Sequence, residues 1–497
     1  MTLRLYNTMA RAAEDFAPLN APDVSLYTCG PTVYNYAHIG NFRTFLFQDV
    51  LKRWLQASGY HVFHVMNLTD VDDKMIKGAA AKGITIAELA VPFIEAFFAD
   101  RDYLRILPAD AYPRATEYIP QQIALVESLL AKGVAYRGED GSVYFSIERF
   151  PAYGKLSRLD TRELKSGAGG RVSADEYAKE DARDFVLWKS VRPEDEVVAA
   201  AWDAPFGRGR PGWHLECSAM ALDLIKQRLG TDVLDIHAGA VDLIFPHHED
   251  EIAQSCAHTG EQDFARVWMH GEFLTMSGTK MSKRFGNILT ARDLREERVD
   301  AGTVRTLFAT THYRQPLDFT DQALDAAREG SRRLGAFQER LAQTAEGESA
   351  EFDAAGERLA RDFAAAMDED LNTPRALAAL FEAARDGNRL LDARSAVSPA
   401  FRAAWDRATG VLQVLPEPAE AIAIGAEQGP GGGAAWQELY PSQPVQQVEW
   451  ATHWAKLRVL AKKERNFAES DRIRAVLAQN GWEVRDNKDG TTELTRA

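Results

Sequence analysis

Several common features are scarce in this sequence of 497 residues, and each absence narrows what the protein can be. Only three cysteines are present and they are widely spaced, so we expect no disulfide framework and predict a cytoplasmic, reducing location. No uninterrupted apolar stretch reaches the roughly 20 residues that a membrane-spanning helix needs. The first residues also lack the basic and then apolar pattern of a secretory signal. We therefore expect no membrane partner.

Positive charge is scarce as well, because 58 Lys and Arg residues face 73 Asp and Glu residues and leave a net charge of −15. Proteins that bind nucleic acids non-specifically carry an excess of basic residues, so this class is disfavoured for the whole chain. A small basic excess occurs at the C-terminal end, where residues 451–497 hold ten Lys and Arg against seven Asp and Glu. A nucleic-acid partner would therefore be bound locally, with this segment as the first candidate.

The stretch around which the chain is organised is a predicted strand–helix–strand unit over residues 25–66. Residues 25–30 form a short apolar run that ends at a Gly-Pro turn, an apolar pattern with helical period follows, and residues 60–66 predict a second buried strand. His38 and Gly40 fall just before the helix, where unpaired backbone N–H groups and the helix dipole favour an anion. Gly40 would also let the backbone approach a flat ligand closely.

A loop far downstream supplies a possible partner for this helix start. Lys280 and Lys283 stand in a Ser/Gly-rich stretch after the apolar run 267–276. Alone, two such lysines would indicate no more than a solvated turn. An imidazole at a helix N-terminus together with a double-lysine loop suits the triphosphate of ATP. This pairing resembles the two signature motifs of the class I aminoacyl-tRNA synthetases.

Candidate metal ligands gather in the second half of the predicted sheet. We expect the sheet to resume at residues 212–220, with a short strand at 233–236, a turn at 237–242 and then a helix. His247 and Glu251 are four residues apart and therefore share one face of that helix. With cysteines from elsewhere they would form a four-ligand zinc set. An acidic helix start with incidental histidines explains these residues equally well, so both interpretations stay open at this point.

The remaining pattern is that of an α/β protein with appended helical parts. The predicted fold is a Rossmann-like parallel nucleotide-binding sheet with an insertion, followed by an α-helical bundle and a small C-terminal domain. Thr320, Thr373 and Ser398 are predicted helix N-caps of the bundle. The predicted parts are the first half of the catalytic domain (1–114), the insertion (115–205), the second half of the catalytic domain (206–270), the lysine-loop region (271–320), the bundle (321–415), a flexible linker (416–448) and the C-terminal domain (449–497).

With these pieces in place, the sequence is similar over nearly its whole length to the cysteinyl-tRNA synthetase family, a class I family. The motifs that carry the resemblance stand in the family's order and spacing: CGPTVYNYAHIGN, NLTDVDDK, GRGRPGWHLECSAM, FPHHEDE and TKMSK. The resemblance implies one active-site zinc per chain, held by Cys29, Cys217, His247 and Glu251. Cys256 matches no ligand position and is expected to be a buried small side chain.

The resemblance also implies roles for residues around this zinc. The catalytic residues would be His38, Asn41, Lys280 and Lys283. ATP, with magnesium, would be bound by His38, Gly40, Asp242 and Lys283. The cysteine substrate would be bound by Thr69, Trp213 and His237. The partners implied are L-cysteine, ATP and tRNA(Cys), whose anticodon the C-terminal domain would read.

Three positions depart from the family pattern. Asn41 stands where histidine is common, Arg284 where serine is usual, and Ala238-Gly239-Ala240 where three glycines are expected to form a turn.

Three alternative functions are a paralogous ligase that passes cysteine to an amino sugar, a zinc hydrolase, and a non-catalytic tRNA-binding protein. The C-terminal tail disfavours the first, the lysine loop the second, and the intact signatures the third.

Overall fold

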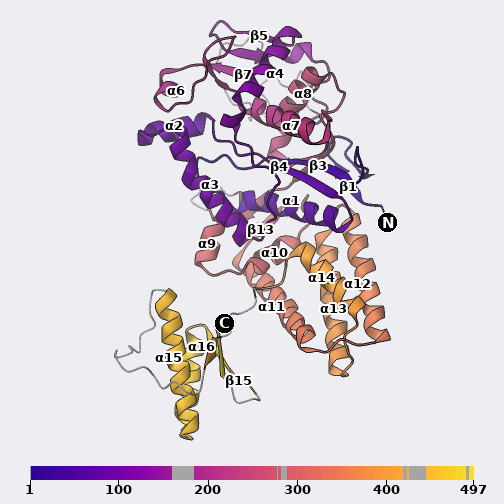
Figure 1. Cartoon of the computed structure of the whole chain (residues 1–497), viewed down its shortest axis with the longest axis vertical. Coiled ribbons are helices and arrows are strands. Elements are labelled where there is room, and N and C mark those ends of the chain that lie inside the picture. The colour runs from indigo at the N-terminus through magenta and orange to yellow at the C-terminus, as the bar shows by residue number, and fades with distance from the viewer. Residues whose placement is uncertain are drawn as a thin grey trace. The chain divides into compact units, whose positions relative to one another are not determined.

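The computed structural model describes residues 2–158, 184–276, 278–280, 288–417, 422–424, 444–487 and 492–496. The chain divides into two compact units, Met1–Pro416 and Glu417–Ala497 (Figure 1). Lys283 and Arg284 lie outside the described residues. Within the described part of the chain, no helix combines the length and the hydropathy that crossing a bilayer requires.

A four-stranded parallel sheet forms the centre of the first unit, in the order β10-β9-β3-β4. Its strands are β3 (Asp23–Thr28), β4 (His61–Met66), β9 (Leu234–Ala240) and β10 (Ala265–Gly271). Helix α1 (Ile39–Ala57) covers one face, and α7 (Trp213–Leu229) and α8 (Glu249–Thr259) lie on the other (Figure 1). The chain leaves β3 toward β4 on one side and returns as β9 on the other. The carboxyl ends of β3 and β9 therefore form a topological switch point, where open parallel sheets bind ligands.

The predicted strand–helix–strand unit is confirmed, but two predictions for the second half of the sheet are wrong. Residues 213–229 form helix α7 and contribute no strand to the sheet. Residues 237–240 form the end of strand β9, because all four pair with β10 and the first two also pair with β3. A Cβ at Gly239 would lie 2.7 Å from Cε1 of His248, so the small residues make room for a packed imidazole and do not form a turn.

The insertion carries an antiparallel sheet of order β5-β6-β7-β8 beside helix α4 (Ile119–Ala131). The strands are β5 (Ala135–Arg137), β6 (Val143–Phe145), β7 (Phe185–Ser190) and β8 (Gly209–Pro211), with the short helix α6 (Pro193–Val197) between the last two. Helices α2 (Asp73–Lys82) and α3 (Ile86–Tyr103) follow β4, and Asp72 caps α2.

A small sheet supports the start of the predicted lysine loop. Strand β11 (Leu274–Met276) pairs with β12 (Thr279–Lys280) and with β13 (Leu317–Phe319). Helices α9 (Ala291–Glu296) and α10 (Ala301–Ala309) lie between the loop and β13 in the sequence. At the N-terminus, β1 (Arg4–Asn7) and β2 (Ala12–Asp15) form a hairpin.

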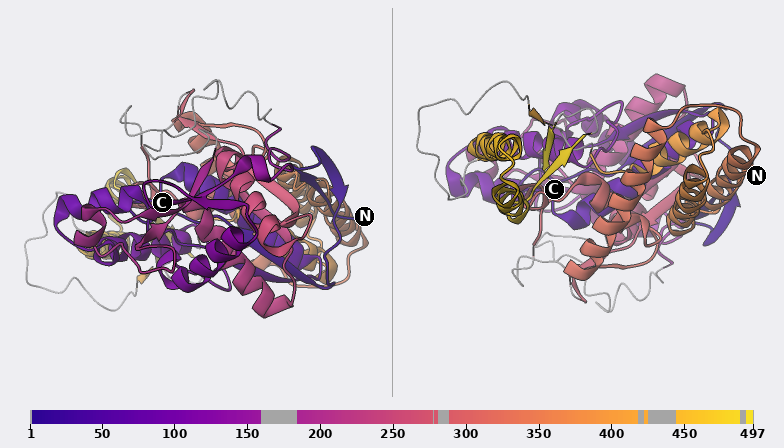
Figure 2. Two further views of the ribbon diagram at one scale, coloured as in Figure 1. Left: turned by 90° about the horizontal axis from the view of Figure 1, so that it is seen from above. Right: turned by 90° about the horizontal axis from the view of Figure 1, so that it is seen from below.

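The four predicted helices of the bundle are present and pack side by side (Figure 2). They are α11 (Asp321–Gln343), α12 (Ala350–Asp368), α13 (Thr373–Asp392) and α14 (Pro399–Leu412). Thr320 and Ser398 cap their helices as predicted. The cap of α13 is Asn372, whose side chain accepts from the Arg375 N–H, so the prediction of Thr373 is wrong by one residue. The proline two positions beyond Asn372 occupies a position where no helical N–H is lost.

The second unit contains two helices and a strand pair in the predicted C-terminal domain. These are α15 (Pro444–Lys463), α16 (Phe467–Gln479), β15 (Trp482–Asp486) and β16 (Thr492–Arg496). The linker prediction is wrong for two stretches, because β14 (Ile422–Ile424) pairs with β16 and α15 begins at Pro444. Indole rings from both helix and strand, including Trp450 and Trp482, make up the buried core of this unit.

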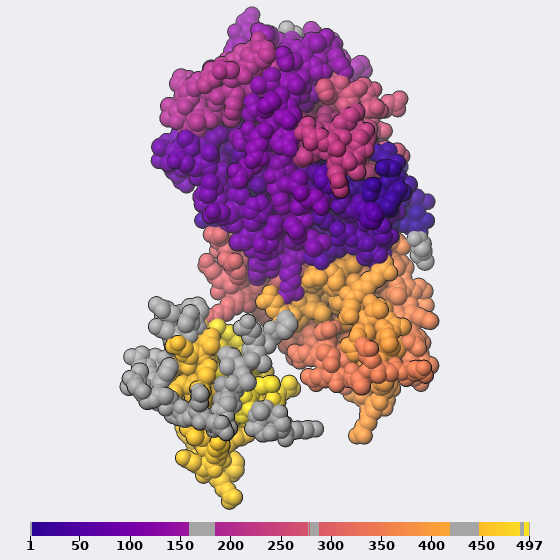
Figure 3. All heavy atoms as spheres, in the orientation of Figure 1, coloured from indigo at the N-terminus to yellow at the C-terminus, as the bar shows by residue number. Residues whose placement is uncertain are grey.

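A buried ion-pair cluster joins the sheet part and the bundle within the first unit, whose packing is visible in Figure 3. The carboxylate of Asp49, on α1, accepts from Arg53 Nε at 2.8 Å and from Arg305 Nη2, on α10, at 2.6 Å. It also accepts from the backbone N–H of Leu107 at 2.8 Å. Arg305 in turn donates to the carbonyl of Leu412, the last residue of α14. One carboxylate therefore connects three elements.

We predict that Asp49→Ala lowers the free energy of unfolding by about 3–5 kcal/mol, because it leaves a buried guanidinium without its charge partner. The matched control is Asp325→Ala, since the Asp325 side chain is 70% exposed and pairs only across the surface of α11. That change should cost about 1 kcal/mol or less. Urea denaturation followed by tryptophan fluorescence measures both. Equal losses in the two variants would show that the Asp49 cluster is not a stabilising junction.

Candidate functional site

An open pocket of about 420 Å³ lies at the carboxyl ends of β3 and β9. The segment that follows β3 supplies most of its wall, and further lining residues come from the starts of α1, α2 and α7, from the end of β9 with the residues after it, and from Ile288. The predicted site residues among its lining are Cys29, His38, Asn41, Trp213 and Asp242. A size of this order is ordinary for a small-molecule site, and the position matches the switch point of the sheet.

The four residues predicted as metal ligands meet beside this pocket. One donor atom from each of Cys29, Cys217, His247 and Glu251 lies within 4.8 Å of the others, and all four residues are buried. Cys29 directly follows β3, Cys217 is on α7, and the other two residues frame the start of α8. His247 Nε2 lies 2.9 Å from Glu251 Oε1, as expected for side chains four residues apart. The cluster thus unites three segments that are distant in the sequence.

Charge is distributed unevenly over these four groups. The thiol of Cys29 hydrogen-bonds the sulfur of Cys217, which lowers the pKa of Cys217 to about 6 and raises that of Cys29. Burial lowers the pKa of His247, but the adjacent Glu251 carboxylate and Cys217 sulfur outweigh it and raise that pKa to about 10. For Glu251, burial raises the pKa and the nearby His237 and His247 bring it down to about 2. A thiolate and a carboxylate are therefore ready to bind a cation.

The chemistry of the four donor atoms also fits a metal ion. Glu251 Oε1 is buried and faces His247 Nε2 at 2.9 Å, but it makes no well-aligned hydrogen bond among the described residues. A cation that meets this oxygen would stabilise the buried carboxylate further. Two sulfurs, one imidazole nitrogen and one carboxylate oxygen form a four-ligand donor set of the type that zinc prefers.

A second constellation of donor atoms overlaps the first. It consists of Cys29, His237, His248 and Glu251. Its two imidazoles are engaged elsewhere: His237 Nε2 lies 2.9 Å from Glu251 Oε2, and His248 Nδ1 shares a proton with His270 at 2.7 Å. Both rings also pack against Trp268. These contacts suit residues that orient ligands from behind.

His38 and Asn41 hold each other at the start of α1. The backbone N–H of Asn41 donates to His38 Nδ1 at 3.2 Å, and the backbone N–H of His38 donates to Asn41 Oδ1 at 3.1 Å. This reciprocal capping box fixes the neutral imidazole with its proton on Nε2. The N–H of Ile39 donates to the carbonyl of Leu289. The helix start therefore has fewer unpaired backbone N–H groups than the sequence predicts. Its polar groups at the pocket are instead the side chains of His38 and Asn41.

The structure gives Gly40 a different local role from the one predicted. A Cβ at Gly40 would lie 3.0 Å from His38 Nδ1, so the glycine leaves space for the imidazole ring. The ring needs that space to accept from Asn41. In the described structure Gly40 therefore makes room for the His38 side chain, and its predicted contact with a ligand stays a prediction.

The residues predicted to bind the amino acid lie at different depths. Trp213 is 39% exposed, lines the pocket and stacks on His247 with ring centroids 4.3 Å apart. Thr69 and His237 are buried and are not among the lining residues. Thr69 instead exchanges backbone hydrogen bonds with Pro31 and Val33, which holds the segment after Cys29. Both residues shape the site from behind its surface.

The lysine loop is described only in part. Lys280 lies in β12, where its backbone pairs with Thr275. One pocket residue, Lys74 at the start of α2, was not singled out by the sequence analysis. The sequence does contain a signal for Lys74, because this lysine is the last residue of the motif NLTDVDDK, which follows the carboxyl end of β4.

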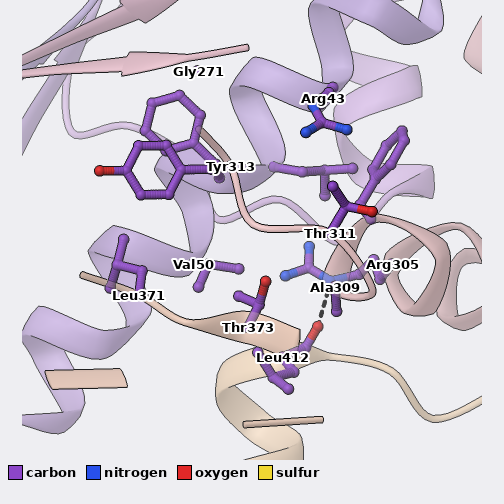
Figure 4. Close-up of a pocket in the computed structure, with 13 residues that line it drawn as sticks. Arg43, Val50, Gly271, Arg305, Ala309, Thr311, Tyr313, Leu371, Thr373 and Leu412 are labelled. Atoms are coloured by element: carbon purple, nitrogen blue, oxygen red, sulfur yellow. Dashed lines mark hydrogen bonds between the residues drawn. The ribbon is translucent and has the colours of Figure 1, made fainter. Parts of the chain in front are cut away.

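A second pocket, between α1, α10 and the bundle, carries no comparable chemistry (Figure 4). It holds only about 40 Å³, and most of its lining is apolar. The guanidinium of Arg305 there donates to the carbonyl of Leu412 and to Asp49. The larger pocket at the sheet edge is therefore the candidate site.

The residues that line this pocket lie within the region that a family model matches. Residues 15–329 match the family model "tRNA synthetases class I (C) catalytic domain", and residues 362–415 match the DALR domain. A cysteine–tRNA ligase of Chlamydia felis is 45% identical over 491 residues, covering 98% of this chain and 97% of the relative. One of Chlamydia trachomatis serovar A is 44% identical, covering 99% of each. The structure of methionyl-tRNA synthetase from Mycobacterium tuberculosis with methionyl-adenylate shares the fold, with a TM-score of 0.56 and 16% identity over 79% of this chain and 90% of that one.

We predict that Cys217→Ala weakens zinc binding by more than about 100-fold, whereas His248→Gln weakens it less, because loss of an orienting contact costs about 10–100-fold. Cys217 belongs only to the first constellation and His248 only to the second. Competition with a chromophoric chelator measures affinity, and elemental analysis measures stoichiometry. A larger loss in His248→Gln than in Cys217→Ala would assign the metal to the second constellation.

Proposed function

The chain belongs to the cysteine–tRNA ligases of class I, and from this premise we propose how its residues carry out the reaction. The enzyme activates L-cysteine with ATP and transfers it to the 3′ end of tRNA(Cys). The observation that carries the assignment to this pocket is the buried Cys29–Cys217–His247–Glu251 cluster next to the start of α1. The described tail, with α15, α16 and its strands, also disfavours the amino-sugar ligase, because that relative lacks an anticodon-reading domain.

We propose that the cluster holds one zinc ion. When bound, the ion would supply a borderline-soft Lewis acid that binds a thiolate and lowers the pKa of a substrate thiol. Trp213 covers His247 on the pocket side, and His237 and His248 orient Glu251 and Cys29 from behind. A serine hydroxyl is a poorer partner for such a site than a cysteine thiol, so the cluster provides a chemical basis for selectivity.

In the first step the carboxylate of cysteine attacks the α-phosphorus of ATP, and pyrophosphate leaves with its electron pair. A carboxylate is already nucleophilic at neutral pH, so no general base is needed. The Nε2–H of His38 and the amide of Asn41 would donate to phosphate oxygens, and Lys283, assisted by Lys280, would stabilise the leaving pyrophosphate, which magnesium accompanies. Asp242 would accept from the ribose hydroxyls of ATP.

In the second step the terminal ribose hydroxyl of tRNA attacks the activated carbonyl, and AMP leaves. We propose that residues 449–497 read the anticodon, while residues 271–320 contact the stem. Phe467 supports the tail assignment: it is 62% exposed at the start of α16, and exposed basic residues precede it at Lys463 and Arg465. Exposed aromatic rings beside cations stack unpaired bases. The three free thiols and the need for ATP and tRNA favour a cytoplasmic location.

The function is tested by ATP–pyrophosphate exchange across the amino acids, with and without tRNA. We predict that L-cysteine supports exchange and that L-serine is disfavoured by more than the roughly 10–200-fold that an enclosing pocket alone provides. The physical reason is that a sulfur-binding cluster discriminates by chemistry as well as shape. Preference for another amino acid, or a cysteine-to-serine ratio inside that range, would contradict the proposal.

We predict that Phe467→Ala raises the KM for tRNA by about tenfold or more, because base–aromatic stacking contributes about 1–3 kcal/mol. Aminoacylation kinetics measure this effect, and cysteine-dependent pyrophosphate exchange in the same preparation should not change. Phe467→Tyr keeps a ring at this position and should restore the KM for tRNA. If Phe467→Ala charges tRNA like the unaltered enzyme, the ring does not contact tRNA.

A further inference from the structure

The charges that line the main pocket are unexpectedly few for a site that takes a triphosphate. Among the described residues around it, Lys74 is the one Lys or Arg, and Asp242 contributes a charge of the opposite sign. His38 lies at the start of α1 as a capped, neutral imidazole. Phosphate groups are bound in proteins mainly by Lys, Arg, magnesium and helix N-termini. Lys74 is therefore the described cation best placed to meet phosphate.

Neighbouring carboxylates form no direct ion pair with Lys74. The charge of Lys74 acts on Asp72, where it opposes the rise in pKa that burial causes, but the Asp72 side chain accepts from the N–H of Met75 at 2.6 Å and so caps α2. Asp73 is held by two cations of the insertion sheet, with Lys189 Nζ at 2.8 Å and Arg210 Nη2 at 2.6 Å. Across the part of the chain that the structure describes, no ion pair is formed by Lys74. The two acids beside it are thus committed to other partners.

One aromatic contact holds the Lys74 side chain at the pocket. Its Nζ lies 5.3 Å from the ring centroid of Tyr34, which is itself a lining residue. A lysine in the first turn of a helix is disfavoured by the helix dipole, so this position is not one that helix stability selects. The cation–π contact keeps the long side chain over the pocket wall while its ammonium group remains exposed.

We propose that Lys74 is a phosphate-binding residue of the active site. This inference rests on the proposed function and adds a residue to it. The ammonium group would pair with a phosphate oxygen, and two substrates bring phosphate to the pocket: ATP, and the 3′-terminal phosphodiester of tRNA. No covalent step is involved. The alternative is a solvated lysine whose only partner is Tyr34, and it predicts no kinetic effect.

The test compares Lys74→Met, Lys74→Arg and the control Lys77→Met in the full-length enzyme. Lys77 lies one turn further along α2, is exposed and does not line the pocket, so it matches Lys74 in charge and helix. Pyrophosphate exchange at varied ATP forms the first arm. The second arm is single-turnover transfer from preformed cysteinyl-adenylate to a tRNA transcript.

We expect Lys74→Met to lower kcat/KM for ATP, or the rate of transfer to tRNA, by about tenfold or more, as for the loss of a charge-assisted hydrogen bond. A fall in the first arm identifies ATP as the phosphate source, and a fall in the second alone identifies tRNA. The KM for cysteine should be unchanged, Lys74→Arg should restore most of the rate, and added salt should reduce the difference.

Lys74→Met rates equal to those of Lys77→Met in both arms would overturn the assignment. A parallel loss in Lys74→Met and Lys74→Arg, with a changed KM for cysteine, would also overturn it, because that pattern indicates a structural role. Failure of the proposed function is distinct, since the unaltered enzyme would then show no cysteine-dependent exchange at all.

Discussion

The buried charge at the base of the pocket is the constraint on which the rest of the structure depends. Removing a carboxylate, an imidazole and two thiols from water is expensive unless each group finds a partner. The partners are the groups themselves, as the lowered pKa of Glu251 and the raised pKa of His247 indicate. Because Cys29, Cys217 and the His247–Glu251 pair come from three separate segments, β3, α7 and α8 must converge at one point. The switch point between β3 and β9 provides that point.

A layer of aromatic side chains behind the cluster keeps those groups in place. His237 hydrogen-bonds Glu251. His248 hydrogen-bonds His270, and His270 in turn hydrogen-bonds the hydroxyl of Thr8. Trp268 packs flat against His237, and Gly239 leaves room for His248. Side chains locked by packing hold a donor set more rigidly than exposed ones can. Selectivity for sulfur would therefore depend on residues that never touch the substrate.

The sequence predicted the parts of this arrangement that local physics specifies. Helical period located α1 and the four bundle helices, capping chemistry located Thr320 and Ser398, and the spacing of four residues put His247 beside Glu251. Strand β9 beyond residue 236 was missed because Ala and Gly mimic a turn until a neighbouring imidazole is known. Strand β14 was missed because its partner lies far along the chain. Cys29 and Cys217 share no local pattern, so only the resemblance joined them before the fold did.

The cations of this acidic chain include some that pair with carboxylates inside the fold and others that remain exposed. Arg53, Arg305, Lys189 and Arg210 are bound to buried or half-buried carboxylates and serve the fold. Their charge is already neutralised where it stands, so it contributes little to attracting a polyanion. A net charge of −15 further repels nucleic acid from most of the surface. Attraction of a polyanion to an acidic chain has to come from local, exposed cations, and Lys74 beside the pocket and the basic residues before Phe467 are two such places. The position of these cations, and not the total charge of the chain, would then decide where phosphate binds.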